Sequence, residues 1–224
     1  MTKRFKVLIA GASTLVFIVS SCVVAESLIT SRIETRIESE LPKASGVSAS
    51  IPLIEIPQNL SSSSIKSAKI DIDSFALKGS EAESAISISA KNISKSKPTI
   101  VGSLDVTATI PATTIIDSAE FENAQIVGNT LQIAVGAGGL GQAKLIPKFS
   151  NNTIYFALQS VSIFGNEISS SSLPADVQNQ IKSRSVRELN VPKGLKLKSV
   201  SLSSKGLSIN LRGSNIQLGK LGLL

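Results

Sequence analysis

The sequence predicts an α+β fold in which β-strands dominate. Three observations lead to this prediction. After residue 42, apolar residues recur at every second position in one segment after another, as in strands that bury one face. Only one long segment has the spacing of an amphipathic helix. The apolar residues are mostly Ile, Leu and Val, and aromatics make up 4% of the chain, which favours strands. We expect about eight to ten strands, mostly antiparallel and one-sided, with one long helix.

The helix is predicted over residues 26–41. Its apolar positions recur every four residues and form a narrow stripe: Ile29, Ile33, Ile37 and Leu41. Arg and Glu occupy most positions between them, so the rest of the cylinder is charged. Pro42 disfavours helical geometry at the residue before it. The helix therefore joins the apolar N-terminus to the strands.

The N-terminus is a candidate membrane segment. Residues 7–25 carry no charge and follow Lys3, Arg4 and Lys6. As a helix, this segment has the length of a bilayer core, about 30 Å, and its positive flank places the N-terminus in the cytoplasm. Three fates stay open. The segment is retained as an anchor, is cleaved as a signal peptide after Ala25, or is lipidated at Cys22, because residues 19–22 resemble a bacterial lipobox.

All three fates have the same consequence for the rest of the chain. Residues 26–224 are predicted to form a single domain outside the cytoplasm, attached to or near the cytoplasmic membrane. We assign residues 1–25 to the N-terminal anchor or signal segment.

Strands are predicted at 47–53, 68–77, 86–90 and 100–110 in the first half of the chain. In the second of these, the apolar parity changes at Phe75, which suggests a bulge near Ser74. The last is the most regular. We expect one face of it to carry Ile100, Leu104, Val106, Ala108 and Ile110.

The second half reads as hairpins with two short helices. The helices are predicted at 113–121 and near 174–184, where Pro174 suits a first turn. Two final strands follow. Turn residues separate the strands at four points: Gly128-Asn129, Asn151-Asn152, Gly165-Asn166 and Lys205-Gly206.

A one-sided sheet of this length must hide its apolar face. The few apolar residues of the helix, at roughly 1.5–3 kcal/mol each, cover only part of it. Either the sheet folds back on itself, or the remaining face holds an apolar ligand.

Several kinds of catalysis are excluded by composition. The chain has no His, and its one Cys is Cys22. Disulfides within the folded part, His/Cys zinc sites and Ser-His-Asp or Cys-His catalysis are therefore excluded. We expect a non-catalytic protein with no cofactor and no metal.

Three motifs suggest chemistry, and each has a simpler interpretation. Residues 136–141 match G-x-G-x-x-G, but a strand-like segment with a proline follows instead of a helix, so we expect a turn or bulge at a cavity rim. Asp71 and Asp73 share a strand face with Lys69, which indicates a solvated face. Serine–lysine spacings at Ser63 and Ser94 are expected by chance in so serine-rich a chain.

The net charge of +7 lies in the C-terminal quarter. Residues 172–224 hold nine Lys and Arg against two acidic residues. An anionic partner is indicated, and phospholipid head groups fit better than nucleic acid, because stacking aromatics are scarce. An ordinary solvated face is the alternative. The candidate head-group contacts are Arg184, Arg187, Lys193, Lys196 and Lys198.

Short motifs near both ends of the chain resemble a known family. The segments are Ala25-Glu26-Ser27-Leu28-Ile29, Gly46-Val47, Ile51-Pro52, Pro57-Gln58-Asn59-Leu60, Leu189-Asn190-Val191-Pro192-Lys193-Gly194-Leu195 and Lys205-Gly206-Leu207. Over nearly the whole chain, this layout resembles the LmeA-like phospholipid-binding family of actinobacterial cell envelopes. The resemblance implies a fold similar to tubular lipid-binding domains, in which a long curved antiparallel sheet wraps the N-terminal helix.

The resemblance also implies a function. We expect a membrane-associated phospholipid-binding or lipid-transfer protein that supports cell-envelope lipid or glycolipid metabolism. Acyl chains would lie between the sheet and the helix stripe of Ile29, Ile33, Ile37 and Leu41. The alternative is a scaffolding envelope protein with a dry core. The sequence identifies neither the lipid nor a protein partner.

Overall fold

The computed structural model describes residues 44–50, 63–76, 83–96, 98–118, 123–135, 141–189 and 191–217. The predicted helix at 26–41, the apolar segment at 7–25 and Cys22 lie outside these residues. Within them the chain is β-dominated, as predicted, and its strands form two six-stranded antiparallel sheets. The sequence predicted one long sheet, so the division into two is a difference.

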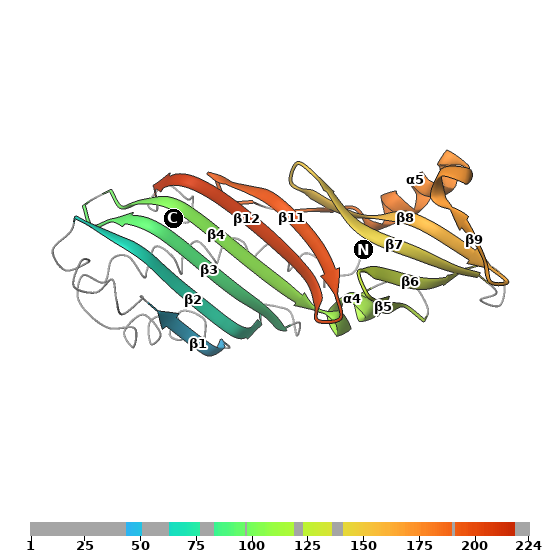
Figure 1. Cartoon of the computed structure of the whole chain (residues 1–224), viewed down its shortest axis with the longest axis horizontal. Coiled ribbons are helices and arrows are strands. Elements are labelled where there is room, and N and C mark those ends of the chain that lie inside the picture. The colour runs from blue at the N-terminus through green and yellow to red at the C-terminus, as the bar shows by residue number, and fades with distance from the viewer. Residues whose placement is uncertain are drawn as a thin grey trace. The chain divides into compact units, whose positions relative to one another are not determined.

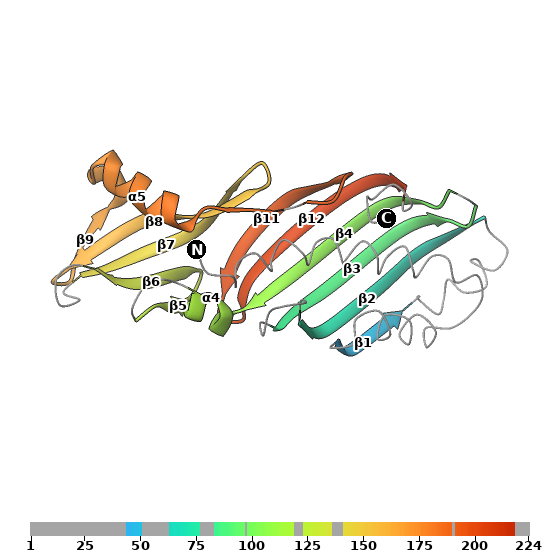
Figure 2. The same cartoon turned by 180° about the vertical axis from the view of Figure 1, so that it is seen from behind.

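Sheet 1 combines the first four strands with the last two (Figure 1). Its order is β1-β2-β3-β4-β12-β11, so the C-terminal hairpin returns to lie beside β4. Figure 2 shows the same order from behind. The strands are β1 (Ser45–Ser50), β2 (Ser64–Ala76), β3 (Glu83–Ser94), β4 (Ile100–Pro111), β11 (Leu195–Ser203) and β12 (Gly206–Gln217).

Sheet 2 is formed by the chain between β4 and β11. Its order is β10-β8-β7-β6-β5, and β9 also pairs with β8. The strands are β5 (Gln125–Val127), β6 (Thr130–Val135), β7 (Gly141–Ser150), β8 (Thr153–Ile163), β9 (Asn166–Ser169) and β10 (Arg187–Glu188). By its contacts the chain divides into two compact units, and all of sheet 2 belongs to the second, which contains residues 109–189 and 199–209.

One face of sheet 1 is a continuous apolar core. On β11, buried Leu195 and Leu197 alternate with exposed Lys196 and Lys198, because successive side chains of a strand point to opposite faces. The same alternation on the other strands places aliphatic side chains in one layer. The most deeply buried are Ile72, Ile88, Ile93, Val101, Leu104 and Val106.

Two interruptions of the alternation alter which residues reach this core. The pairing of β2 with β3 shifts register between Ile72 and Phe75, which confirms the bulge predicted near Ser74. On β4 the prediction was wrong at its first position, because Ile100 is 42% exposed and Val101 is fully buried. Since Val101 and Leu104 are both buried, the alternation breaks between them.

The break in β4 lies beside an irregular point of β3. Asn92 has a φ of 54°, and a Cβ added at Gly102 would lie 2.9 Å from the Cβ of Asn92. A residue with positive φ in a strand typically accompanies a bulge. This irregularity depends on two neighbouring strands, so the periodicity of β4 alone did not reveal it.

The predicted hairpins are present in sheet 2. Val127 pairs with Thr130 across Gly128-Asn129, and Ser150 pairs with Thr153 across Asn151-Asn152. The third turn lies one residue earlier than predicted, at Phe164-Gly165, and Ile163 pairs with Asn166 beside it. Both central residues have positive φ, 49° and 80°, as in a type I′ turn.

Both short helices predicted for the second half are present. Helix α4 spans Ala112–Ser118. Helix α5 spans Ala175–Ser185 and begins after Pro174, and the short 3₁₀ turn η4 (Ser170–Ser172) precedes it.

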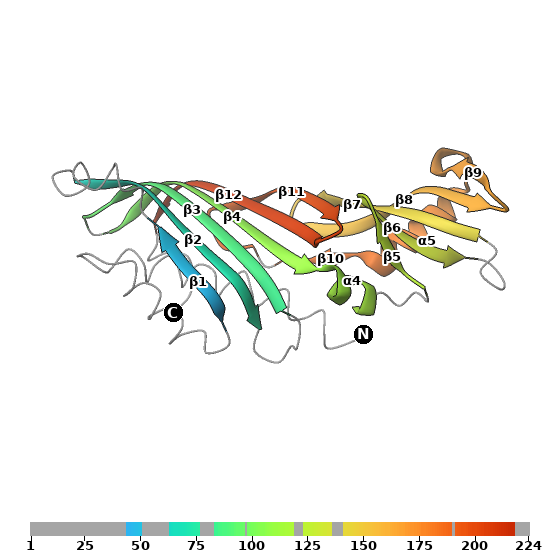
Figure 3. The ribbon, with the colours of Figure 1, turned by 60° about the horizontal axis from the view of Figure 1, so that its bottom comes forward.

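Helix α5 packs along β8 (Figure 3). The Ser185 hydroxyl accepts the backbone N–H of Phe156 at 2.9 Å and lies 3.1 Å from the Phe156 carbonyl. The Lys182 ammonium lies 4.6 Å from the centre of the Tyr155 ring. These contacts attach the C-terminal end of α5 to β8. Strand β10 follows directly and pairs with β8.

A polar cluster ties β4 to β12 on the face opposite the core of sheet 1. Asn210 donates to the Asp105 carboxylate and to the Thr107 hydroxyl, at 2.5 and 3.1 Å. The Arg212 guanidinium donates to the other oxygen of Asp105, with Nε at 2.8 Å and Nη2 at 2.6 Å. One carboxylate therefore accepts bonds from two side chains of the C-terminal strand.

We expect Asp105→Ala to lower the free energy of unfolding by about 1–2 kcal/mol, because Asn210 and Arg212 lose their shared acceptor while both stay partly accessible to water. Urea unfolding followed by circular dichroism measures the change. Asp73→Ala is the matched control, because Asp73 is an exposed carboxylate on a strand of the same sheet. Equal losses in the two variants would contradict a role for the cluster.

Candidate functional site

The predicted site residues lie in different parts of the chain. The helix stripe of Ile29, Ile33, Ile37 and Leu41, and Cys22, lie outside the described residues. Of the five basic residues, Lys193, Lys196 and Lys198 belong to the first compact unit, and Arg184 and Arg187 belong to the second.

Three of the five basic residues are exposed lysines that lie in β11 or just before it. Lys196 and Lys198 share the exposed face of the strand, and Lys193 is exposed in the turn before it. None of the three forms an ion pair with another described residue. Arg187, in β10, donates through Nη1 to the carbonyl of Val186 at 2.8 Å. A free cation face is therefore present on β11.

One face of sheet 2 is apolar from β6 to β8. Leu131 pairs with Leu145, which pairs with Leu158, and all three are buried. Because directly paired residues share a face, the same face carries Phe149 at one end of the sheet and Ile163 at the other. Phe149 is 39% exposed and Ile163 is 42% exposed. The apolar face is thus buried in the middle and accessible at both ends.

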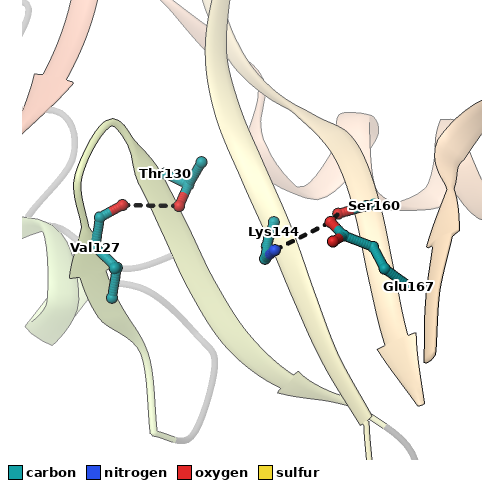
Figure 4. Close-up of polar contacts among 5 residues, drawn as sticks. All are labelled: Val127, Thr130, Lys144, Ser160 and Glu167. Atoms are coloured by element: carbon teal, nitrogen blue, oxygen red, sulfur yellow. Dashed lines mark hydrogen bonds and ion pairs between the residues drawn. The ribbon is translucent and has the colours of Figure 1, made fainter. Parts of the chain in front are cut away.

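The opposite face of sheet 2 carries an ion pair beside a buried hydroxyl (Figure 4). Lys144 and Ser160 are directly paired on β7 and β8, and Glu167 lies on β9. One Glu167 oxygen accepts bonds from the Ser160 hydroxyl at 2.5 Å and the Lys144 ammonium at 3.0 Å. These two hydrogen bonds, in that order, and the charge of Lys144 hold the pKa of Glu167 below its ordinary value.

The same face holds the turn between β5 and β6. The Thr130 hydroxyl, whose residue is 8% exposed, donates to the carbonyl of Val127 at 2.9 Å. This bond satisfies a carbonyl at the hairpin end and helps to hold the short strand β5 against β6.

The Lys144–Ser160–Glu167 cluster is suited to structure more than to catalysis. A serine nucleophile needs a base that takes its proton, but a carboxylate with a lowered pKa is a weak base. Ser160 is also 5% exposed, so a substrate has little access to its hydroxyl. In the described part of the chain, His, Cys, Asp and Glu form no group of three or more able to hold a metal.

We expect the stability of the protein to fall as the pH drops through the lowered pKa of Glu167. A carboxylate whose pKa is lower in the folded state contributes stability above its unfolded pKa and loses it on protonation. Glu167→Gln should therefore show a weaker loss of stability in acid, as measured by urea midpoints between pH 3 and 7. Glu188→Gln removes the same charge at an exposed position and is the control; the same flattening there would assign the effect to net charge.

The carboxylates singled out in the sequence occupy a solvated face, as expected. The Lys69 ammonium lies 2.8 Å from Asp71, and Asp73 is exposed. Burial acts to raise the pKa of Asp71, but hydrogen bonds from Lys69 and Ser87 and the charge of Lys69 together hold that pKa below its ordinary value. Asp71 is thus paired with Lys69 and ionised.

A pocket of about 340 Å³ lies on the polar face of sheet 2, beyond the ion pair. It is open to solvent. Its lining residues are Asn123, Gln125, Ala134, Gly141, Gln142, Ser162, Phe164 and Gly165. Sequence reasoning missed this pocket as a site, although it placed residues 136–141 at a cavity rim. The predicted hairpins did not contain this signal, because a regular ladder from Asn151-Asn152 places Gln142 opposite residue 161, and a register shift between Lys144 and Leu145 brings it beside Ser162.

Gly141 is the last residue of the glycine motif and opens β7. A strand therefore follows the motif, as predicted, and the helix that a dinucleotide site requires does not. In the described residues, no helix has the length and apolar character needed to cross a membrane.

Comparison with protein-family models gave no match for this chain. Searches of curated proteins and of solved structures likewise gave none.

Proposed function

We propose that the protein is a membrane-associated, extracytoplasmic phospholipid-binding or lipid-transfer protein that supports cell-envelope lipid or glycolipid metabolism without catalysis. One observation carries the proposal. Sheet 2 has an apolar face that runs across β6, β7 and β8, and the face stays accessible at Phe149 and Ile163. The exposed apolar side chains at the two ends of this face are suited to contact with acyl chains.

The energetics favour such a contact. Burial of apolar surface contributes roughly 25 cal/mol per Å², or about 0.8 kcal/mol for each methylene of an acyl chain. An acyl chain that contacts either end of the face therefore covers its own surface together with the exposed part of Phe149 or Ile163. Most of the gain comes from the lipid, so the protein surface need not be large.

Basic residues supply the second half of the proposal. Lys196 and Lys198 are exposed on one face of β11, and ammonium groups attract phosphate head groups at an anionic membrane surface. We propose the same role for Lys193, Arg184 and Arg187. The helix stripe of residues 29–41 as a wall for acyl chains, an N-terminal anchor or a lipid on Cys22, and kinship with the LmeA-like family are part of this proposal and come from the sequence.

A second candidate is a scaffolding envelope protein with a dry core. The deep burial of the apolar face of sheet 1 favours it, because Val101, Leu104 and Val106 are no more than 1% exposed. A face packed this closely leaves no surface for a ligand. The two candidates make opposite predictions for sheet 2.

The test uses the full chain in detergent, incubated with vesicles of phosphatidylglycerol or phosphatidylcholine, re-isolated and weighed by native mass spectrometry. We expect bound phospholipid, more of it from the anionic vesicles. The double variant Phe149→Asp/Ile163→Asp should carry less lipid. Lys196→Glu/Lys198→Glu should lose the preference for anionic lipid.

Val127→Asp is the matched control for the apolar face. Val127 is 48% exposed and lies on the other face of the same sheet, so this variant should carry lipid normally. A chain that takes up no phospholipid, or a Phe149/Ile163 variant that takes up as much as the unchanged protein, would favour the scaffold.

A further inference from the structure

We propose that the pocket on the polar face of sheet 2 binds one neutral sugar ring. The pocket lies on the opposite face of the sheet from Phe149 and Ile163, among residues of β5, β6, β7 and the β8–β9 turn. Its volume of about 340 Å³ is near the lower end of small-molecule sites, roughly 300–1,000 Å³. That volume suits a single ring and not an extended chain.

The hydrogen-bonding groups of the pocket match hydroxyl groups. Asn123, Gln125 and Gln142 each offer an amide that both donates and accepts, and Ser162 offers a hydroxyl. Within the described residues, the side chains of Asn123, Gln142 and Ser162 make no hydrogen bond. Gln125 makes one long contact, 3.4 Å to Gln132. Asn123, Gln142 and Ser162 can therefore turn to a ligand without breaking a hydrogen bond to another described residue, and Gln125 gives up one long contact.

Gln142 and Ser162 are directly paired across β7 and β8. Gln142 also pairs with Ala134 on the other side. The small side chain of Ala134 leaves the space that the amides surround. Gly141 lines the pocket with its backbone, because a Cβ there would point to the other face of the sheet, toward Val135. Gln142 and Ser162 are thus held on strands, with the opening beside the small side chain of Ala134.

Phe164, in the turn between β8 and β9, supplies an aromatic wall to the pocket. It lines the pocket and is 75% exposed, the most exposed of the large apolar residues among those described. Its φ of 49° is a conformation that costs a bulky residue energy and that glycine or asparagine adopts more easily. A pyranose ring has a face of C–H groups, which packs on an aromatic ring and removes it from water.

The surrounding charges favour a neutral ligand. None of the eight lining residues is charged. Among the described residues, Lys144 follows Gln142 on β7 and Glu167 on β9 pairs with Ser162, and these two charges form an ion pair with each other. An ionised ligand would lose water without gaining a countercharge, whereas a neutral hydroxylated ring exchanges hydrogen bonds with water for hydrogen bonds with the amides.

The ring could belong to a free sugar or to the head group of a glycolipid. The chemistry of the pocket is the same for both, and this inference does not depend on phospholipid binding at the opposite face.

The test is a titration of the full chain with neutral methyl hexopyranosides, followed by saturation-transfer NMR. The detergent is lauryldimethylamine oxide, which has no sugar head group. We expect saturable binding of at least one neutral hexopyranoside. Gln142→Ala and Phe164→Ala should each weaken it roughly three- to tenfold, the value of one neutral hydrogen bond or a comparable contact.

Two variants serve as matched controls. Gln159→Ala removes an exposed glutamine from β8 outside the pocket, and Phe149→Ala removes an exposed phenylalanine at the other end of sheet 2. Neither should change sugar binding. Absence of binding by every sugar offered, both free and as glycolipid, equal effects of control and pocket variants, or a preference for glucuronate over the neutral sugars would overturn the proposal.

A second arm distinguishes the source of the ring. Vesicles of phosphatidylcholine are offered with and without a neutral hexosyl-diacylglycerol. If the head group is the ligand, retention on the glycolipid vesicles should exceed retention on plain vesicles and should fall in Gln142→Ala. If free sugar binds and glycolipid adds nothing, the ligand is a soluble sugar. If the protein takes up no phospholipid but still binds sugar, the proposed lipid function is wrong and the sugar-binding proposal stands.

Discussion

Gly206→Ala is expected to lower the free energy of unfolding by more than about 3 kcal/mol, or to prevent folding at 37 °C. Gly206 opens β12 with a φ of 129°, a conformation that is restricted almost entirely to glycine. A Cβ at this position would also overlap the carbonyl oxygen of Ile110 and lie 2.9 Å from the amide nitrogen of Ala112. Both neighbours are backbone atoms, so relief requires the chain itself to move.

A backbone hydrogen bond explains why Gly206 lies so close to Ile110 and Ala112. The N–H of Ala112 donates to the carbonyl of Lys205 at 3.3 Å, which ties the end of β4 and the start of α4 to the turn between β11 and β12. Gly128→Ala is the matched control: Gly128 has a φ of 61° but no atom within 4 Å of an added Cβ, so only about 1 kcal/mol should be lost. Urea unfolding measures both, and equal losses would rule out the steric account.

Val101→Asp is expected to unfold the protein or to lower its stability by several kcal/mol, whereas Ile100→Asp should cost about 1 kcal/mol or less. Val101 is fully buried among aliphatic side chains, so an aspartate there becomes an unpaired carboxylate in an apolar core. Ile100 is 42% exposed, so an aspartate there stays in water. The two substitutions introduce the same group at adjacent positions.

This pair tests the alternation of β4 directly. The regular period of the sequence places Ile100 in the core and Val101 outside it, so it predicts the reverse order of the two effects. If Val101→Asp is too unstable to purify, Val101→Ala against Ile100→Ala gives the same comparison by urea midpoint. A larger loss at position 100 would mean that β4 keeps a regular period from its first residue.

The candidate site shows what kind of information a single sequence contains. The hairpin at Asn151-Asn152 could be predicted, and the turn at Phe164-Gly165 could be predicted to within one residue, because turn chemistry is local. The Lys144–Ser160–Glu167 cluster could not, because β7 and β8 shift register between Lys144 and Leu145. A regular ladder extended from the hairpin would place Lys144 opposite residue 159, one position from its observed partner. Such a shift moves a side chain to the other face of the sheet.

The pocket depends on correct pairing across four strands. Gln125 pairs with Gln132, and Gln142 pairs with both Ala134 and Ser162, so four strands must be in register before the amides meet. No single segment carries that pattern. The exposure of Phe164 was not predicted either, because Phe164 lies in a turn that was predicted one residue later along the chain.

The sequence alone determined that the described chain is built of one-sided antiparallel strands. It also placed one short helix from residue 113 onward and another near 174–184, and it predicted exposed lysines that alternate with buried leucines on the strand at 195–203. Each of these follows from periods and turn residues within one segment. Only the tertiary structure decided that the strands form two sheets, that β12 returns to β4, and that Val101 replaces Ile100 in the core. These depend on pairings between residues about 10 to 110 positions apart, which local periodicity does not encode.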